Sequence, residues 1–528
     1  MPKLTIDGRE VEVPEGTNLI EAARLAGVEI PYFCYHPYLS VVGQCRICMV
    51  EIEGQPRLSI ACNTQASDGM TVRSATSERV REARAAVMEF LLANHPLDCP
   101  VCDQAGECLL QDHSVDEGTD LTHMVETRRT FPGYERRLIG PHVVQNQNRC
   151  IHCSRCIRVT REISGTAALT FKARGNSTYI DTFDGEPFDD PFSACAADVC
   201  PVGALTVREF RFRKRAWKLR STPSVCPGCS IGCNVFMDHH ERVVYRFRPR
   251  ENAAVNATWL CDHGRFLADG LNVQDLLHPR LRGGSAAGVP WSEVLPALAR
   301  EIEAAASIRV VASPAMTNEA LFLVRELFAT RRNADVVVPV LQGEPRRMRN
   351  GRGEWAESTD AHPNSHGARA LGLTVVDEEG LGRFLYGAAD LTIVLDPSSH
   401  PFLAGDEAGR LLRDGATVVA ARTAHPLGAV AGTVLPMASL ASEEGTFTSS
   451  AGLTQRVAPA FAPAGAALPL WRILVSLARA MGSGALDFDS PAEVFAAMAA
   501  ACPAFENLSW DALAADAGAG AEEREHVG

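Results

Sequence analysis

The hydrophobic pattern at the start of the chain predicts two short strands and a helix. Apolar and polar residues alternate over Lys3–Ile6 and Glu10–Val13, and the Asp7-Gly8 pair between them is typical of a hairpin turn. Apolar positions then recur at helical spacing from Leu19 to Ala26, with Thr17 or Asn18 available to cap the first turn. Strand, turn, strand and helix ahead of a cysteine-rich loop indicate a small β-grasp domain.

Further along, the same pattern predicts a longer helix and then an α/β domain. A helical stripe runs over Ser77–Ala93 and should stop before Pro96, because proline disfavours continuation. After residue 262, helical patterns such as Glu293–Ala304 and Asn318–Thr330 alternate with short apolar runs typical of buried parallel strands. The apolar runs are Ile308–Ser313, Ala334–Val338, Asp390–Leu395 and Ala416–Ala421.

Composition narrows the class of protein. A chain of 528 residues should form several domains, and it contains no apolar run of 18 residues, so we expect no transmembrane helix. The first residues lack the charged and apolar regions of a signal peptide, which predicts a cytosolic chain. In that compartment, seventeen cysteines favour metal or redox chemistry over disulfides. The net charge of −13 disfavours nucleic acid as the main partner, so we interpret the basic and aromatic residues 208–220 as an exposed strand or linker.

Fifteen cysteines and one histidine form four sets with the spacing of metal ligands. All of them lie in the first half of the chain, between Phe33 and Cys261. In chain order the sets are Cys34, Cys45, Cys48 and Cys62; His95, Cys99, Cys102 and Cys108; Cys150, Cys153, Cys156 and Cys200; and Cys226, Cys229, Cys233 and Cys261. We interpret them as ligands of four iron–sulfur clusters.

Each set is supported by a different sequence feature. The first reads C-x10-C-x2-C-x13-C, which is close to the loop of plant-type [2Fe–2S] ferredoxins, and it follows the predicted β-grasp elements. In the second, His95 stands only three residues before a Cys-x2-Cys pair, and a neutral imidazole can replace one thiolate. The third is a single C-x2-C-x2-C run whose distant fourth member is followed by Pro201, as in bacterial ferredoxins.

The fourth set reads C-x2-C-x3-C-x27-C, a spacing that would suit zinc almost as well as iron–sulfur. Zinc also stays open for the others: a structural knot in the first set, a three-cysteine, one-histidine site in the second, and a weaker rival in the third.

The remaining chemically interesting residues have plainer interpretations. We predict that Cys195 and Cys502 are buried thiols and that His36 and His113 are structural. The Gly351–Ala356 segment is a weak dinucleotide fingerprint, because it follows an arginine-rich polar stretch instead of a strand.

The order of these four sets resembles the large iron–sulfur subunit of respiratory NADH:quinone oxidoreductase, complex I. The matching motifs are the Cys34–Cys62 loop, His95-Pro96-Leu97-Asp98-Cys99, Cys200-Pro201-Val202-Gly203-Ala204-Leu205 and Trp259-Leu260-Cys261-Asp262. The resemblance covers roughly the first half of the chain. It implies one [2Fe–2S] and three [4Fe–4S] clusters, with electrons passing from the first set to the third and then to the second, and with the fourth off the main path.

The second half resembles a shortened form of the molybdopterin-oxidoreductase domain, in which Glu443–Thr448 matches one segment. We expect no molybdopterin, because the sole candidate metal-ligating cysteine downstream of the fourth set is Cys502. The expected fold class is multidomain α/β and α+β. The expected domains are residues 1–75, a [2Fe–2S] ferredoxin-like β-grasp domain; 76–140, the histidine-containing [4Fe–4S] domain; 141–220, a ferredoxin-like [4Fe–4S] domain; 221–277, a [4Fe–4S] domain of the molybdopterin-oxidoreductase N-terminal type; 278–510, the α/β domain; and 511–528, a disordered tail.

The leading functional hypothesis is an electron-transfer subunit with no catalytic residue or substrate site of its own. The resemblance implies partners that bind flavin and NADH, partners in the quinone module, and a peripheral position on the cytoplasmic face of the plasma membrane, with proton translocation by the whole complex. The alternative is a formate dehydrogenase or hydrogenase–diaphorase subunit, although such chains usually carry two C-x2-C-x2-C-x3-C-P runs. A zinc-stabilised scaffold is the third hypothesis.

Overall fold

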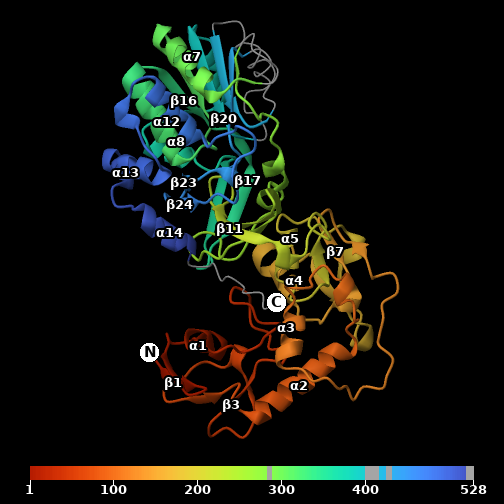
Figure 1. The fold of residues 1–528 in the computed structure, drawn as a ribbon. Helices are drawn as coiled ribbons and strands as arrows, with labels where there is room; N and C mark the ends of the chain where they lie inside the picture. Colours follow the sequence, from red (N-terminus) through yellow and green to blue (C-terminus); the bar gives the residue numbers. More distant parts are fainter. Residues whose placement is uncertain (282–287, 399–415, 424–430, 519–528) are drawn as a thin grey trace. The chain divides into compact units, whose positions relative to one another are not determined.

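The computed structural model describes residues 1–281, 288–398, 416–423 and 431–518. They form two compact units, Met1–Lys218 and Leu219–Gly528, each with its own hydrophobic core (Figure 1). Within the described residues, no helix is both long and apolar enough to cross a membrane. The predicted mixture of α/β and α+β domains is confirmed.

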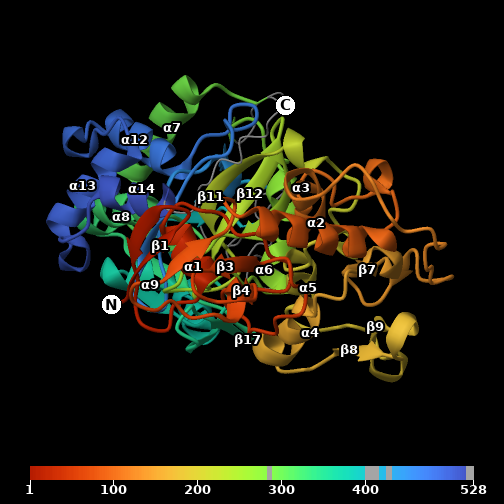
Figure 2. The same ribbon diagram turned by 90° about the horizontal axis from the view of Figure 1, so that it is seen from below.

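The first unit opens with the expected β-grasp domain, in which helix α1 lies against a mixed sheet (Figure 2). The Asp7-Gly8 hairpin turn is confirmed, with both residues at positive φ (48° and 82°). Asn18 caps α1 by accepting a hydrogen bond from the Glu21 backbone N–H at 3.0 Å. The sheet order is β2-β1-β5-β3-β4, and the elements are β1 (Lys3–Ile6), β2 (Arg9–Glu12), α1 (Leu19–Leu25), β3 (Met49–Ile52), β4 (Ser59–Ile60) and β5 (Thr71–Arg73).

The rest of this unit consists of short elements that present the second and third cysteine sets. Helix α2 (Glu78–Ala93) is the predicted long helix, and the Ser77 hydroxyl caps it by accepting from the Val80 N–H. Two small antiparallel sheets and three short helices follow: β6 (Arg137–Leu138), β7 (Val143–Gln145) and β10 (Leu205–Val207); β8 (Leu169–Lys172) and β9 (Tyr179–Thr182); and α3 (Leu109–Asp116), α4 (Arg155–Val159) and α5 (Ser193–Asp198).

The second unit begins with an antiparallel sheet that carries the fourth cysteine set at its end. Its strands are β11 (Arg220–Val225), β12 (Asn234–His240) and β13 (Val243–Pro249), and helix α6 (Asp262–Phe266) follows. Asp238 on β12 is 1% exposed and forms ion pairs with Arg246 (2.7 Å) and Arg248 (2.6 Å) on β13. A buried carboxylate needs such partners, because desolvation alone would make its charge costly.

The predicted α/β domain is confirmed as a sheet whose order, within the described residues, is β14-β22-β21-β20-β15-β16-β19. All neighbouring strands are parallel except β14. The strands are β14 (Arg280–Leu281), β15 (Ile308–Ala312), β16 (Asp335–Pro339), β19 (Thr374–Val376), β20 (Leu391–Asp396), β21 (Ala416–Ala421) and β22 (Thr433–Pro436).

Helices cover both faces of this sheet, which explains the continuous apolar runs. Val310 belongs to a core cluster with residues of α7 (Trp291–Ala304), α8 (Asn318–Val324), α12 (Leu470–Ala480) and α13 (Pro491–Ala501), whereas Val311 belongs to a separate cluster with residues of α10 (Glu378–Leu385). Helix α8 continues as a π-helical segment, Arg325–Thr330, so the predicted Asn318–Thr330 helix is confirmed with a change of winding.

The remaining elements are helix α9 and two hairpins, together with α14: α9 (Ser365–Ala370), β17 (Gln342–Arg349) with β18 (Trp355–Asp360), β23 (Gly445–Thr448) with β24 (Thr454–Val457), and α14 (Trp510–Gly518). The tail predicted from residue 511 therefore starts within a helix, and its remainder, 519–528, lies outside the described residues.

Candidate metal centres

The first cysteine set lies in the loop between α1 and β3 and in the turn after β4. The backbone N–H groups of Cys34 and Cys45 each approach the sulfur of the other residue at 3.5 Å. A hydrogen bond from Cys45 lowers the pKa of Cys34 to about 5, and one from Cys62 lowers the pKa of Cys48. Cys34, Cys48 and Cys62 are each only 1% exposed. The loop thus holds two close pairs of thiols, and in each pair a hydrogen bond from one thiol lowers the pKa of the other.

The second set surrounds the end of helix α2 and the start of α3. His95 follows the C-cap of α2, and its Nδ1 is buried without a hydrogen-bond partner. Burial, followed by the nearby Arg149, lowers the pKa of His95 to about 4, so its ring is neutral at pH 7. His95, Cys99 and Cys108 line one cavity of about 470 Å³. A neutral imidazole whose buried nitrogen has no hydrogen-bond partner can ligate a metal through that nitrogen. Without such a ligand, the buried polar atom would be left unsatisfied at a cost in free energy.

Cys102 completes this set from outside the cavity lining. Its thiol interacts electrostatically with those of Cys99 and Cys108. Burial raises the pKa of Cys108 to about 12, which shows how strongly this interior disfavours an uncompensated thiolate. Cys99 is exposed, so the set reaches the protein surface at that residue.

The third set closes around a small cavity. All four of its cysteines line a space of about 20 Å³, into which α4 brings Cys156 and the residues after α5 bring Cys200. Burial raises the pKa of Cys150 to about 12 and that of Cys200 to about 11. Cys195 lies on α5, is fully buried, and does not line this cavity. This arrangement supports the choice of Cys200 over Cys195.

The fourth set joins the end of β11, the start of β12 and the first turn of α6. The Cys226 N–H donates to the Cys233 carbonyl at 2.8 Å, and the Cys261 sulfur accepts from the Gly264 N–H at 3.5 Å. Burial raises the pKa of Cys229 to about 11 and that of Cys226 well above its usual range. Cys226, Cys229 and Cys233 are therefore shielded from water, whereas Cys261 is half-buried.

Three residues near these sets were missed by sequence reasoning. A Cβ atom on Gly203 would stand 2.3 Å from the Cys102 sulfur, and one on Gly264 would stand 2.6 Å from the Cys226 sulfur. Arg346 on β17 interacts electrostatically with cysteines of the fourth set, and its buried Nε has no hydrogen-bond partner. Gly203 lies in a motif already singled out, but nothing local in the sequence indicates Arg346.

The unpartnered His95 nitrogen, the cavity lined by four thiols and the two glycines that leave room for sulfur all suit bound iron–sulfur groups. Among the described residues, no three His, Cys, Asp or Glu side chains stand close enough together to bind a single metal ion. Within each set, the hydrogen bonds and electrostatic interactions described above join its members two at a time.

The first and third sets are tied together by arginines from α4. Arg158 is 4% exposed and donates to the carbonyls of Cys34, Ser40 (2.5 Å) and Cys153 (3.4 Å). Arg155 donates to the carbonyl of Tyr35 at 2.5 Å. Helix α4, which carries Cys156 of the third set, thus supplies buried hydrogen-bond donors to carbonyl groups in the loop of the first set.

The third and second sets also meet. The Leu109 N–H donates to the Pro201 carbonyl at 3.1 Å, and the Cys108 sulfur lies 3.7 Å from the same oxygen. Phe33, Met88 and Val202 belong to one core cluster that includes cysteines of all three sets. These three sets therefore share a continuous, water-poor interior.

The other predicted residues are in ordinary surroundings. His36 is half-buried, and its Nδ1 accepts from the Tyr38 N–H at 3.3 Å, while His113 packs edge-on against Phe33 with 5.2 Å between the ring centroids. Cys502 is 3% exposed, with Arg325 Nη1 at 3.1 Å from its sulfur. The Gly351–Ala356 segment connects β17 to β18 in an antiparallel hairpin, which is not the strand-to-helix turn of a dinucleotide site.

Comparison with protein families finds four matching domains. They are the 2Fe-2S iron-sulfur cluster binding domain (residues 2–77), the NADH-ubiquinone oxidoreductase-G iron-sulfur binding region (84–121), the NADH-quinone oxidoreductase subunit 3 ferredoxin-like domain (140–206) and the molybdopterin oxidoreductase Fe4S4 domain (219–272). Each matched range contains all four members of one of the predicted sets.

Individual relatives agree with these domains. The chain is 41% identical over 300 residues to the mitochondrial NADH-ubiquinone oxidoreductase 78 kDa subunit of Candida albicans, covering 56% of this chain and 41% of the relative. It is 39% identical over 328 residues to the G subunit of NADH-quinone oxidoreductase from Rickettsia bellii, covering 62% and 48%. It is 39% identical over 331 residues to the NADH-ubiquinone oxidoreductase 75 kDa subunit of Reclinomonas americana, covering 62% and 47%. The chain thus spans less than half the length of these relatives.

Proposed function

Because more than half of this chain is homologous to iron–sulfur subunits of NADH-quinone oxidoreductase, we propose that it is an electron-transfer subunit of such a complex. The names of these relatives favour this function over that of a formate dehydrogenase or hydrogenase–diaphorase subunit. NADH oxidation and quinone reduction would take place on partner subunits that carry flavin and the quinone module. Proton translocation would belong to the whole complex, with this chain peripheral on the cytoplasmic face of the membrane.

We propose that the four sets are the ligands of four iron–sulfur clusters that carry the electrons. Cys34, Cys45, Cys48 and Cys62 bind a [2Fe–2S] cluster. Three [4Fe–4S] clusters are bound by His95, Cys99, Cys102 and Cys108, by Cys150, Cys153, Cys156 and Cys200, and by Cys226, Cys229, Cys233 and Cys261. When bound, these groups supply one-electron carriers inside the protein. The domain boundaries predicted from the sequence are part of the same proposal.

The observation that carries this function is the single core shared by the first three sets in residues 1–218. Arg158 joins the loop of the first set to that of the third, and Pro201 joins the third to the second. These contacts support the order first, third, second for electron transfer. Apart from the exposed Cys99, the cysteines of these sets lie in or beside an apolar interior, where fixed protein groups control the charge on each site.

The surface beside the second set is consistent with the exit of electrons to a partner. Leu97 and Leu121 are 80% and 77% exposed and line the cavity of the second set, and Val101, which is 62% exposed, stands between Cys99 and Cys102 in the sequence. Exposed apolar side chains that gather next to a functional group are typical of protein interfaces.

Low-temperature EPR of the chain purified with its native partners tests this function. We expect NADH to reduce one [2Fe–2S] and at least two [4Fe–4S] centres that are assigned to this chain by ligand substitution. A complex whose spectrum is unchanged when Cys34 or Cys153 is replaced by serine would overturn the proposal.

A further inference from the structure

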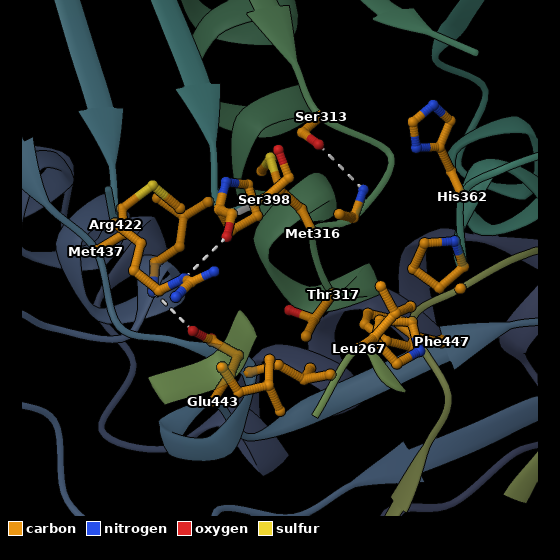
Figure 3. Close-up of a pocket in the computed structure, with 18 of the residues that line it drawn as sticks. Leu267, Ser313, Met316, Thr317, His362, Ser398, Arg422, Met437, Glu443 and Phe447 are labelled. Carbon is orange, nitrogen blue, oxygen red and sulfur yellow. Dashed lines mark hydrogen bonds between the residues drawn. The ribbon is translucent and has the colours of Figure 1, made fainter. Parts of the chain in front are cut away.

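A cavity of about 350 Å³ lies at the carboxyl edge of the parallel sheet in the second unit (Figure 3). Its lining includes residues that directly follow four strands: Ser313 after β15, Pro397 after β20, Arg422 after β21 and Met437 after β22. The chain runs from β15 to β16 on one side and later to β20 on the other, so the order of the strands reverses between β15 and β20. In open parallel sheets, ligands bind at this edge, where the order reverses.

The opposite wall of the cavity comes from the fourth cysteine set. Pro227 and Gly228 stand between Cys226 and Cys229, and His263 is two residues beyond Cys261. The volume is within the range of small-molecule sites, roughly 300–1,000 Å³. A bound molecule would therefore lie beside the fourth set.

One oxygen of a buried carboxyl group in the lining lacks a hydrogen-bond partner. Glu443 is 9% exposed, its Oε2 accepts from the Leu470 N–H at 3.3 Å, and its buried Oε1 has no hydrogen-bond partner (Figure 3). Burial, helped by the nearby Glu319, raises the pKa of Glu443 to about 8, so the carboxyl is mostly protonated at neutral pH. A buried neutral carboxyl can donate its O–H to an acceptor placed in the cavity.

The rest of the described lining suits an uncharged guest. Leu267, Met316 and Phe447 contribute apolar surface. Arg422 is the one lysine or arginine in this lining, and its Nη1 already donates to the carbonyls of Gly270 (2.8 Å) and Val273. The molybdopterin cofactor that the fourth matching domain implies carries phosphate charge and a metal, whereas this lining offers no thiol and no cluster of cationic donors. The residues present do not fit that cofactor.

We propose that this cavity binds a small, uncharged, largely apolar molecule whose carbonyl or ring-nitrogen atom accepts a hydrogen bond from Glu443. The guest satisfies the orphaned carboxyl group, and the apolar lining supplies most of the contact surface. This site does not take part in electron transfer through the first three sets. A result that disproved the binding site would therefore not affect the proposed function.

Equilibrium dialysis of the full chain with two matched probes tests the site. Coumarin is a bicyclic molecule with a carbonyl acceptor, and naphthalene is a bicyclic molecule of similar size without one. We expect about one coumarin per chain, bound roughly tenfold more tightly than naphthalene, since one probe can pair with the buried donor and the other cannot. Equal affinity for the two probes, or binding of neither, would overturn the proposal.

Two variants and a control test whether the preference for coumarin over naphthalene depends on Glu443. Glu443→Gln keeps a neutral donor and should keep the preference for coumarin, whereas Glu443→Leu should abolish it. Glu444→Gln is the matched control, because Glu444 pairs with Arg456 at 2.7 Å and does not line the cavity. A preference that survives in Glu443→Leu overturns the assignment. If that variant does not fold, the comparison of the two probes on the unaltered chain still decides the matter.

Discussion

At the scale of single residues, His95 is the position at which chemistry and structure are most closely linked. Its ring is half-buried and neutral, and the buried Nδ1 has no hydrogen-bond partner within the protein. An imidazole adds no negative charge to a cluster, whereas a thiolate adds one. The identity of this one side chain should therefore influence the reduction potential of the second site.

We predict that His95→Cys retains the second cluster but lowers its reduction potential, by something on the order of 100 mV. An EPR-monitored redox titration measures the shift. His113→Gln is the control, because His113 packs against Phe33 and belongs to no ligand set. An unchanged or higher potential in His95→Cys would remove His95 from the ligand list.

The choice between Cys195 and Cys200 is a second question at this scale. Cys200 lines the cavity of the third set together with its three partners, and Cys195 does not. We expect Cys200→Ser to lose or strongly perturb the third cluster and Cys195→Ser to leave its EPR signal unchanged. The opposite pattern would show that the fourth ligand was misassigned.

At the scale of elements, helix α4 acts as a connector between two cysteine loops. Arg155 and Arg158 are one turn apart, and both donate into the loop of the first set. The helix is only five residues long, so these long-range contacts contribute more to its position than its own hydrogen bonds can.

We predict that Arg158→Met lowers the reduction potentials of the first and third clusters, because a positive charge close to both is removed. The same change should cost roughly 2 kcal/mol or more of unfolding free energy, since it leaves buried carbonyls without donors. Redox titration and chemical denaturation measure the two effects. Arg161→Met, an exposed position on the following turn, should leave both quantities nearly unchanged. Equal effects of the two substitutions would contradict this prediction.

The β12–β13 pair offers a pH-dependent prediction. Burial alone would raise the pKa of Asp238, but Arg248 and Arg246 outweigh it and hold that pKa well below its usual range. Because the pKa of Asp238 is lower in the folded state, its ionised carboxylate stabilises the protein at pH values above the unfolded-state pKa of about 3.9. This stabilisation is lost as the pH falls through the folded-state pKa.

Asp238→Asn should therefore destabilise the second unit by roughly 3–5 kcal/mol at pH 7, and its deficit should shrink as the pH is lowered below about 4. Denaturant unfolding at several pH values measures this difference. Glu241→Gln is the control, because the side chain of Glu241 is 83% exposed. A deficit that does not change with pH would show that the ion pairs are not its source.

At the scale of the whole molecule, the two compact units divide the ligand sets between them. Residues 1–218 contain the first three sets, and residues 219–528 contain the fourth together with the α/β domain. The latter domain carries its ligand cavity at the edge of the parallel sheet.

We expect the full chain, isolated anaerobically, to contain about fourteen iron atoms, from one two-iron and three four-iron clusters. Metal analysis and the visible absorption spectrum provide the measurement. Four zinc atoms and a colourless protein would instead support the scaffold hypothesis. Replacing Cys226 with serine should lower the iron content by about four atoms and leave the sites of residues 1–218 intact.

The sequence alone determined the features that depend on neighbours along the chain. The Asp7-Gly8 turn, a helix that begins after Thr17 or Asn18, and the buried strands of the α/β domain follow from local periodicity and turn chemistry. The spacing of the cysteines was enough to propose four ligand sets, because the closely spaced members of each set must lie near one another, whereas the distant fourth members Cys62, Cys200 and Cys261 were assigned by their motifs.

Only the tertiary structure decided which distant groups face one another. Arg158 meets Cys34 across 124 positions, Arg346 faces the fourth set from a separate hairpin, and Gly203 makes room for the Cys102 sulfur. The unpaired oxygen of Glu443 likewise became visible only when its burial and its surroundings were known. Burial and charge environment are sums over contacts between segments far apart in the chain, so no local pattern of residues contains them.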